Sequence, residues 1–207
     1  MTLQVLIPCK PLAAGKSRLA TLLDGATRQA LCSELLRQTL ELALTVAARQ
    51  DCHVVTSDRA AMALAASNGI AALDDPDHGL NAALAAARDQ LCRRLPPDAA
   101  LLVLPIDLPC ATSANLVDVC GRNADVVMAP DRARAGTNLL WLGSKAIRRF
   151  AFRFGPESFT RHRDQATAAG LRLELSEAAE LAFDIDGPAD YLEWQQAGMA
   201  KMPQQQV

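Results

Sequence analysis

The chain alternates short apolar runs with longer segments in which apolar residues recur at helical spacing. Such runs predict strands, and the longer amphipathic segments predict helices. The expected strands cover residues 3–8, 52–56, 70–73, 101–105, 124–130, 139–142, 170–175 and 181–186. The expected helices cover residues 26–48, with Thr27 as the cap, and 60–67, 79–94, 112–122 and 188–197. This alternation through short links predicts an α/β chain with a mostly parallel sheet in three layers.

Residues 101–109, which read LLVLPIDLP, are expected to form the centre of the sheet. An unbroken apolar run is typical of a strand buried on both faces, and ligands of parallel sheets lie at the carboxyl ends of the strands. Asp107 falls at that end, where one or two carboxylates commonly hold a hard cation next to a phosphate. A turn or a helix cap is the simpler interpretation of Asp107, and this stretch alone leaves both open.

Composition narrows the class of protein. With 207 residues, half of them hydrophobic, the chain is long enough for one large core, so we expect a single domain over residues 1–198 and a flexible tail over 199–207. A formal net charge of -2 argues against a nucleic-acid or membrane-surface binder. An aromatic content of 4% argues against platforms that stack nucleic-acid bases.

The cysteines and the amino terminus indicate a cytoplasmic protein. Six cysteines are scattered without a C-x-x-C pair, which favours reduced core residues over a zinc site or disulfides. The first residues lack the basic start and long apolar core of a signal peptide. No apolar run approaches the roughly 20 residues that are needed to cross a bilayer.

A basic loop follows the first expected strand. Residues 9–18 read CKPLAAGKSR and carry Lys10, Lys16 and Arg18, an arrangement that suits phosphate binding. GKS also ends a Walker A motif, but the position of its first glycine is Lys10, and Pro8 and Pro11 remove amide donors. A P-loop is therefore the weaker alternative, and a solvated basic turn is a third interpretation.

Two later stretches carry further candidate chemistry. The expected strand 181–186 contains Asp184 and Asp186, and alternate residues of a strand face the same side, so both carboxylates would point at one site. Residues 155–158, reading GPES, have the composition of a helix start, where exposed amides can bind an anion. An ordinary capped surface helix explains the second stretch equally well.

Six segments in order resemble one family. They are IPCKPLAAGKSRLA at 7–20, GLNAAL at 79–84, VLPIDLP at 103–109, MAPDRARAGTN at 128–138, FGPESF at 154–159 and FDIDGPAD at 183–190. In these segments the chain resembles the phospholactate guanylyltransferases of coenzyme F420 biosynthesis, over nearly its whole length to about Trp194. The resemblance implies a three-layer Rossmann-like nucleotidyltransferase fold with a mixed, mostly parallel central sheet.

The resemblance also implies an activity. The family transfers GMP from GTP, with Mg²⁺, to the phosphate of 2-phospho-L-lactate, phosphoenolpyruvate or 3-phosphoglycerate, and releases pyrophosphate. The alternatives are a P-loop-type kinase or NTPase, a catalytically inactive nucleotide-binding regulatory protein, and a relative that activates a phosphosugar or molybdopterin. The segment FGPESF favours a small acid over the last of these.

Site residues follow from the resemblance position by position. The metal-binding and catalytic positions match Asp107 and Asp186, with Lys16 as a further catalytic residue. Lys16 and Arg18 match the basic nucleotide loop, and the acceptor positions match Lys10, Thr137, Gly155 and Ser158. Two departures, Cys9 for a small aliphatic residue and Gly187 for a threonine, remove no charged group.

Several points stay open at this stage. A reader of guanine needs an acceptor facing its N1–H and amine, and Asp58, Asp74 and Asn81 are candidates, although both aspartates suit turns as well. The resemblance does not select the acid among the three. It also leaves open a homodimer, hand-over of the product to the next pathway enzyme, and assistance of Asp186 by Asp184.

Overall fold

A single seven-stranded sheet organises the computed structural model, which describes residues 2–75 and 79–198. The tail expected at 199–207 lies outside the described residues. The strands are β1 (Leu3–Pro8), β2 (Cys52–Val55), β3 (Ala71–Leu73), β4 (Ala100–Val103), β5 (Val126–Pro130), β6 (Thr137–Leu142) and β7 (Leu173–Leu175). Their order across the sheet is β3-β2-β1-β4-β6-β5-β7.

The strand directions confirm a mixed, mostly parallel sheet. Strand β6 runs antiparallel to both of its neighbours, and every other pairing in the sheet is parallel. The central strand β4 is buried at every position, as the apolar run predicted. Because β6 is reversed, its first residues reach the edge at which β1 and β4 end, so residues from the second half of the chain join that edge.

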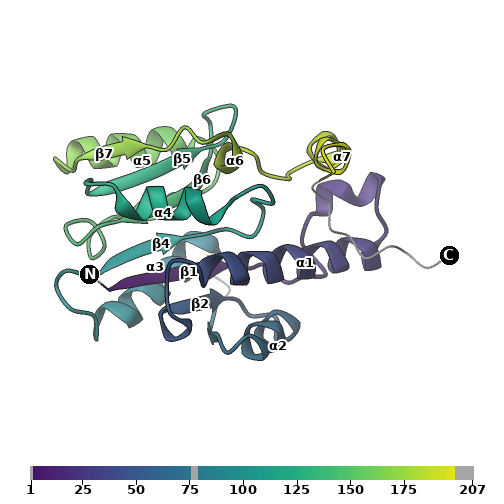
Figure 1. Ribbon diagram of the computed structural model, residues 1–207, viewed down its shortest axis with the longest axis horizontal. Helices are drawn as coiled ribbons and strands as arrows, with labels where there is room; N and C mark the ends of the chain where they lie inside the picture. Colours follow the sequence, from purple (N-terminus) through teal and green to yellow (C-terminus); the bar gives the residue numbers. More distant parts are fainter. Residues whose placement is uncertain (1, 76–78, 199–207) are drawn as a thin grey trace.

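Helices cover both faces of the sheet and complete the three layers (Figure 1). The α-helices are α1 (Gly25–Ala43), α2 (Arg59–Ser67), α3 (Leu80–Cys92), α4 (Ser113–Gly121), α5 (Ser158–Ala168), α6 (Ala179–Ala182) and α7 (Pro188–Gln196). Short 3-10 helices η1 (Ser17–Thr21) and η2 (Arg49–Asp51) lie in the connections. One core cluster joins the sheet to α1, α2 and α4, and a second joins its other face to α3 and α5.

A third, smaller core joins two segments that lie far apart in the sequence. Helix α7 packs beside η1 and the first half of α1, with Leu19, Leu31, Ile185 and Trp194 all buried. This contact brings the basic loop after β1 next to the acidic segment before α7 (Figure 1). Burial of these apolar side chains therefore positions charged side chains that the next section describes.

Two local predictions were wrong. The first helix ends at Ala43 rather than near residue 48, and its cap is Asp24, whose carboxylate accepts the Thr27 N–H at 2.7 Å. The expected strand 181–186 is absent: α6 occupies its start, and the rest is extended without sheet pairing. Phe183 and Ile185 of this segment are buried in the small third core, whereas Leu181, in α6, belongs to the core cluster that includes the sheet.

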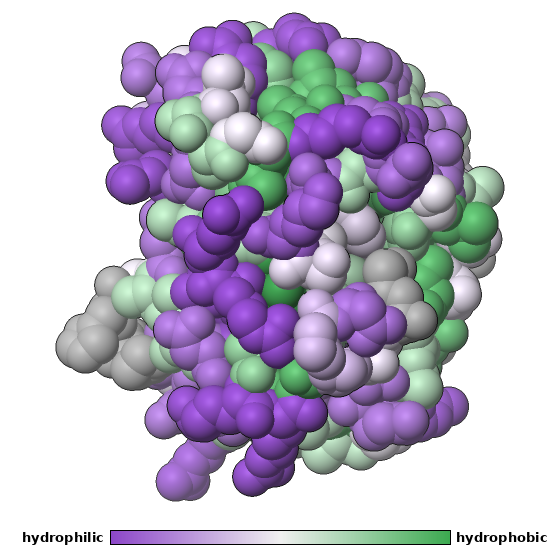
Figure 2. Space-filling model, turned by 90° about the vertical axis from the view of Figure 1, so that its left-hand side faces the viewer, coloured by the Kyte–Doolittle hydropathy of each residue, from purple (hydrophilic) through white to green (hydrophobic). Residues whose placement is uncertain are grey.

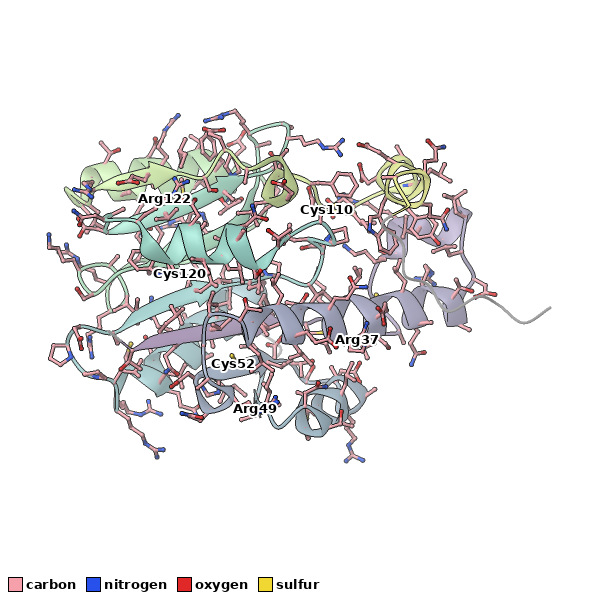
Figure 3. All side chains as sticks on the ribbon, viewed as in Figure 1. Arg37, Arg49, Cys52, Cys110, Cys120 and Arg122 are labelled. Atoms are coloured by element: carbon pink, nitrogen blue, oxygen red, sulfur yellow. The ribbon has the colours of Figure 1, made fainter. Side chains whose placement is uncertain are left out.

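The cysteines form no disulfides, as expected for reduced core residues. All six are free thiols; Cys9, Cys32 and Cys52 are buried and the others half-buried. Figure 3 shows Cys52, Cys110 and Cys120 on separate parts of the fold. The face at the amino ends of the parallel strands, shown in Figure 2, is covered mostly by hydrophilic residues. Among the described residues, no helix combines the length and apolar character that a membrane span needs.

Candidate active site

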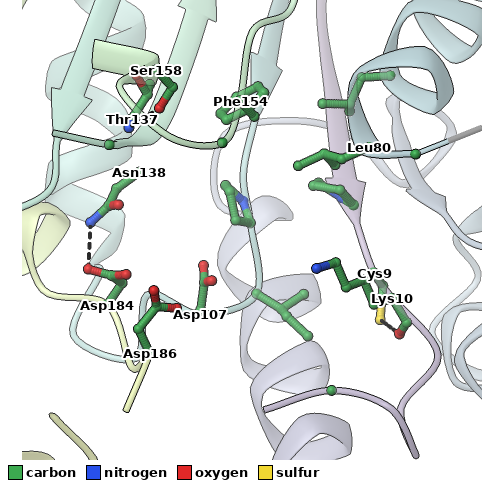
Figure 4. Close-up of a pocket in the computed structure, with 18 of the residues that line it drawn as sticks. Cys9, Lys10, Leu80, Asp107, Thr137, Asn138, Phe154, Ser158, Asp184 and Asp186 are labelled. Atoms are coloured by element: carbon green, nitrogen blue, oxygen red, sulfur yellow. Dashed lines mark hydrogen bonds between the residues drawn. The ribbon is translucent and has the colours of Figure 1, made fainter. Parts of the chain in front are cut away.

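A cavity of about 860 Å³ lies at the carboxyl ends of β1 and β4 and the amino end of β6. Most of the residues singled out from the sequence line it: Lys10, Lys16, Arg18, Asp107, Thr137, Gly155, Ser158 and Asp186. Asp184 lines it as well. In Figure 4 the three aspartates lie on one side, with Thr137 and Ser158 beyond them and Lys10 pointing in from the opposite wall. The cavity thus brings together an acidic end and an end suited to anions.

A backbone hydrogen bond joins the two segments that form the acidic end. The Ile185 N–H donates to the backbone carbonyl of Asp107 at 3.0 Å, which ties the 184–186 segment to the loop after β4. Asp184 is half-buried, and burial together with the charges of Asp107 and Asp186 raises its pKa to about 6. Like charges held this close would repel one another without a cation, so the arrangement favours one.

The acidic end suits a hard divalent cation that a substrate phosphate also ligates. Carboxylate oxygens are the ligands that Mg²⁺ prefers, and Mg²⁺ usually takes one or two of them together with phosphate oxygens rather than a complete protein cage. Among the described residues, no three carboxylate, thiol or imidazole groups converge closely enough to form such a cage. The donor set therefore fits a cation that arrives with a nucleotide.

Basic side chains of the loop after β1 neutralise these carboxylates. The Lys16 amine donates to the carbonyl of Ile185 and lies 3.5 Å from an Asp107 oxygen. Arg18 forms an exposed ion pair with Asp186 at 3.1 Å. Both cations line the cavity next to its acidic end.

The loop itself is tightly packed around Gly15. The amides of Ala14 and Gly15 both donate to the carbonyl of Pro11, so they are not directed at a ligand as P-loop amides are. The backbone of Lys16 is left-handed, with φ 51°. Residues other than glycine rarely adopt this conformation, and such residues cluster at functional sites. A Cβ on Gly15 would lie 2.6 Å from the Cys32 sulfur, too close for contact.

Gly15→Ala is expected to lower the free energy of unfolding by about 1–3 kcal/mol, because the added methyl group overpacks the space beside Cys32. Cys32→Ala should relieve that contact, so the double variant should lose less stability than the sum of the two single changes. Chemical denaturation of the four proteins measures this coupling. If the losses of stability in the two single variants simply add in the double variant, the added methyl group does not clash with the Cys32 sulfur.

The opposite end of the cavity presents hydroxyl and amide groups. The Thr137 N–H donates to the Ser158 hydroxyl at 2.8 Å, which joins the start of β6 to the start of α5. Gly155 has φ 117°, a value that essentially only glycine adopts, and Glu157 is left-handed with φ 56°. The turn of residues 155–158 therefore needs this glycine to present Ser158 to the cavity.

Two functional candidates were missed or left open from the sequence. Asn138 was not singled out, yet it is buried in the cavity wall, and its amide donates to the carbonyl of Leu181 at 3.1 Å and to Asp184 at 3.3 Å. It orients Asp184, whose role the sequence analysis left open. The sequence feature that could have identified Asn138 is its position as a polar residue directly after Thr137, at the start of a strand.

The structure does not bring the three candidate guanine readers to the cavity. Asp58 accepts the Ala60 N–H as a helix cap and also the Leu12 N–H at 2.6 Å. Asn81 exchanges two hydrogen bonds with the backbone of Phe154. Asp74 does not line the cavity either, whereas its neighbour Asp75 and Ser57 do.

Comparison with families of known proteins agrees with the family resemblance of the sequence motifs. Residues 3–205 match the family described as guanylyl transferase CofC like. The chain belongs to this family. This guanylyl transferase is 38% identical over 202 residues to a phosphoenolpyruvate guanylyltransferase of Rubrobacter xylanophilus, covering 96% of both chains. It is also 38% identical to a protein of the same name from Chloroflexus aggregans, over 88% of this chain and 91% of the relative.

Solved structures agree on the fold. A nucleotidyl transferase from Methanothermobacter superposes with a TM-score of 0.66 at 17% identity, covering 95% of this chain and 97% of the other. At that identity the likeness concerns the fold alone. Together with the family match, it confirms the nucleotidyltransferase fold and excludes the P-loop kinase for this guanylyl transferase.

Proposed function

We propose that this guanylyl transferase joins GMP, taken from GTP, to the phosphate of phosphoenolpyruvate in coenzyme F420 biosynthesis. The observation that carries the proposal is the arrangement of the cavity, with an acidic end beside Lys16 and an anion-binding end at Thr137 and Ser158. The choice of phosphoenolpyruvate rests on the names of the relatives from Rubrobacter and Chloroflexus.

The chemistry needs positioning and charge neutralisation more than proton transfer. An acceptor phosphate, with a second pKa near 6, is largely dianionic at neutral pH and needs no general base. One of its oxygens forms a bond to the α-phosphorus of GTP, the bond between that phosphorus and the bridging oxygen breaks, and the electron pair leaves with pyrophosphate. Two anions must approach each other, so opposing charge is the main requirement.

Each group in the cavity has a role in this step. Asp107 and Asp186, assisted by Asp184, would hold Mg²⁺, which when bound would supply positive charge that offsets the negative charge of the reacting phosphates. Lys16 and Arg18 neutralise the departing pyrophosphate. The remaining residues hold the acceptor acid: Lys10, Thr137, Gly155 and Ser158.

The test is pyrophosphate release by the purified protein with Mg²⁺, for each nucleoside triphosphate against phosphoenolpyruvate, 2-phospho-L-lactate and 3-phosphoglycerate. We expect release with GTP and phosphoenolpyruvate, and loss of release when a chelator removes the metal. Release with another acid would overturn the choice of acceptor. If no pair releases pyrophosphate although the protein binds GTP measurably, the catalytically inactive regulatory protein would be favoured.

A further inference from the structure

His162 lies directly behind the anion-binding end of the cavity, where the proposed chemistry assigns it no role. It is on α5 and is 0% exposed. Its ring packs against Phe150 and Phe154, with ring centres 5.7 Å and 5.1 Å away. Both ring nitrogens have partners: Nε2 lies 2.9 Å from the backbone nitrogen of Arg153, and Nδ1 lies 3.0 Å from the Thr137 hydroxyl.

These two contacts fix the tautomer of the ring. The Arg153 N–H can only donate, so Nε2 accepts, and in a neutral imidazole the proton is then on Nδ1. Nδ1–H therefore donates to the Thr137 oxygen. Burial, with a smaller contribution from the charge of Arg153, lowers the pKa of His162 to about 4, so the ring stays neutral at physiological pH.

The consequence for Thr137 is that its hydroxyl hydrogen is left available to donate to a ligand. The oxygen accepts from His162, which leaves the hydroxyl hydrogen, and Thr137 has no acceptor for it among the described residues. Ser158 is in the same position, because its oxygen accepts the Thr137 N–H. Both side chains are more than nine-tenths buried yet line the cavity. Two oriented O–H donors at one end of a cavity suit an anionic group of a ligand.

We propose that His162 is a positioning residue that holds the Thr137 hydroxyl, beside that of Ser158, ready to donate to the anionic groups of the acceptor acid. This inference rests on the proposed function, since it concerns how the same cavity selects its acceptor. His162 does not touch the substrate itself, because it has no exposed surface. A histidine that merely fills the core would affect stability and both substrates alike, so the two roles separate experimentally.

The experiment compares His162→Phe, which keeps the aromatic volume, with His162→Asn, whose amide N–H can still donate to Thr137. In His162→Phe we expect the KM for phosphoenolpyruvate to rise about 10-fold while the KM for GTP changes less than 2-fold. His162→Asn should recover part of that loss. Thr137→Val should show a similar rise, and adding His162→Phe to it should raise the KM little further, since both changes remove one contact.

His53 offers a matched control. It is also buried, and its Nε2 hydrogen bond goes to Gln4 on the strand side, away from the cavity. His53→Phe should leave the KM for both substrates unchanged. Equal rises in both KM values for His162→Phe, or additive effects of His162→Phe and Thr137→Val, would overturn the positioning role.

Calorimetric titration of phosphoenolpyruvate separates this inference from the proposed function. Weaker binding to His162→Phe than to the wild type supports the positioning role, even where the wild type releases no pyrophosphate and the proposed function fails. Equal binding to both proteins overturns it. If His162→Phe does not fold, the same titration is made with His162→Asn and Thr137→Val. Weaker binding of phosphoenolpyruvate to both variants supports the positioning role, and weaker binding to Thr137→Val alone overturns it.

Discussion

Asp107→Asn is expected to lower the rate of pyrophosphate release about 100-fold while the chain stays folded. The side chain lies in the loop after β4 and faces the cavity beside Lys16. Asparagine keeps its shape but removes the charge that would hold Mg²⁺ against the nucleotide. Because the Asp107 side chain is partly exposed, loss of its ion pair should cost no more than about 1 kcal/mol of stability.

The measurement is the turnover rate at saturating GTP and acceptor, together with thermal unfolding of each protein. Asp118→Asn is a matched control, because Asp118 is an exposed carboxylate on α4 that pairs with Arg122 away from the cavity. That variant should keep full activity. Retention of more than about a tenth of the wild-type rate by Asp107→Asn would remove Asp107 from the proposed metal site.

The fold was largely predictable because burial leaves a direct mark on the sequence. The unbroken apolar run at 101–105 predicted a central strand, and β4 is buried at every position. The reversed direction of β6 was not readable from its pattern, because a strand buried on both faces looks the same in either direction. The family resemblance implied a mixed sheet but did not say which strand is reversed.

The segment before α7 shows why periodicity can mislead. Its alternating apolar residues predicted a strand, but Phe183 and Ile185 are buried against η1, α1 and α7 instead, and the segment pairs with no strand of the sheet. The conclusion drawn for the site survived, because an extended chain alternates its side chains with or without a partner strand. Asp184 and Asp186 accordingly both line the cavity.

Contacts between distant residues were beyond the reach of the sequence. The pairing of Thr137 with His162 spans 25 positions and depends on how β6 and α5 meet. Nothing in the local pattern distinguishes His162 from a histidine that only fills the core. Asp58 failed to reach the cavity for a related reason: its carboxylate is already used to cap α2 and to hold Leu12.

Lys16→Met is expected to lower kcat/KM about 100-fold and, at the same time, to tighten binding of a divalent cation to the protein without nucleotide. Lys16 is only 10% exposed, and its amine lies between the carbonyl of Ile185 and the carboxylate of Asp107. In the nucleotide-free protein the amine therefore competes with a cation for the same negative charge. During turnover the positive charge of Lys16 is needed to neutralise the leaving pyrophosphate. Removal of the lysine therefore slows the reaction, although the cation binds better.

The two readouts are steady-state kinetics and titration of Mn²⁺, as a paramagnetic substitute for Mg²⁺, into the free protein. Arg18→Met provides the comparison, because Arg18 is 74% exposed and its ion pair with Asp186 is screened by water. Its effects should have the same signs and be smaller. If Lys16→Met weakens Mn²⁺ binding and activity together, the lysine holds the carboxylates in place rather than competing for them, since only competition predicts opposite changes.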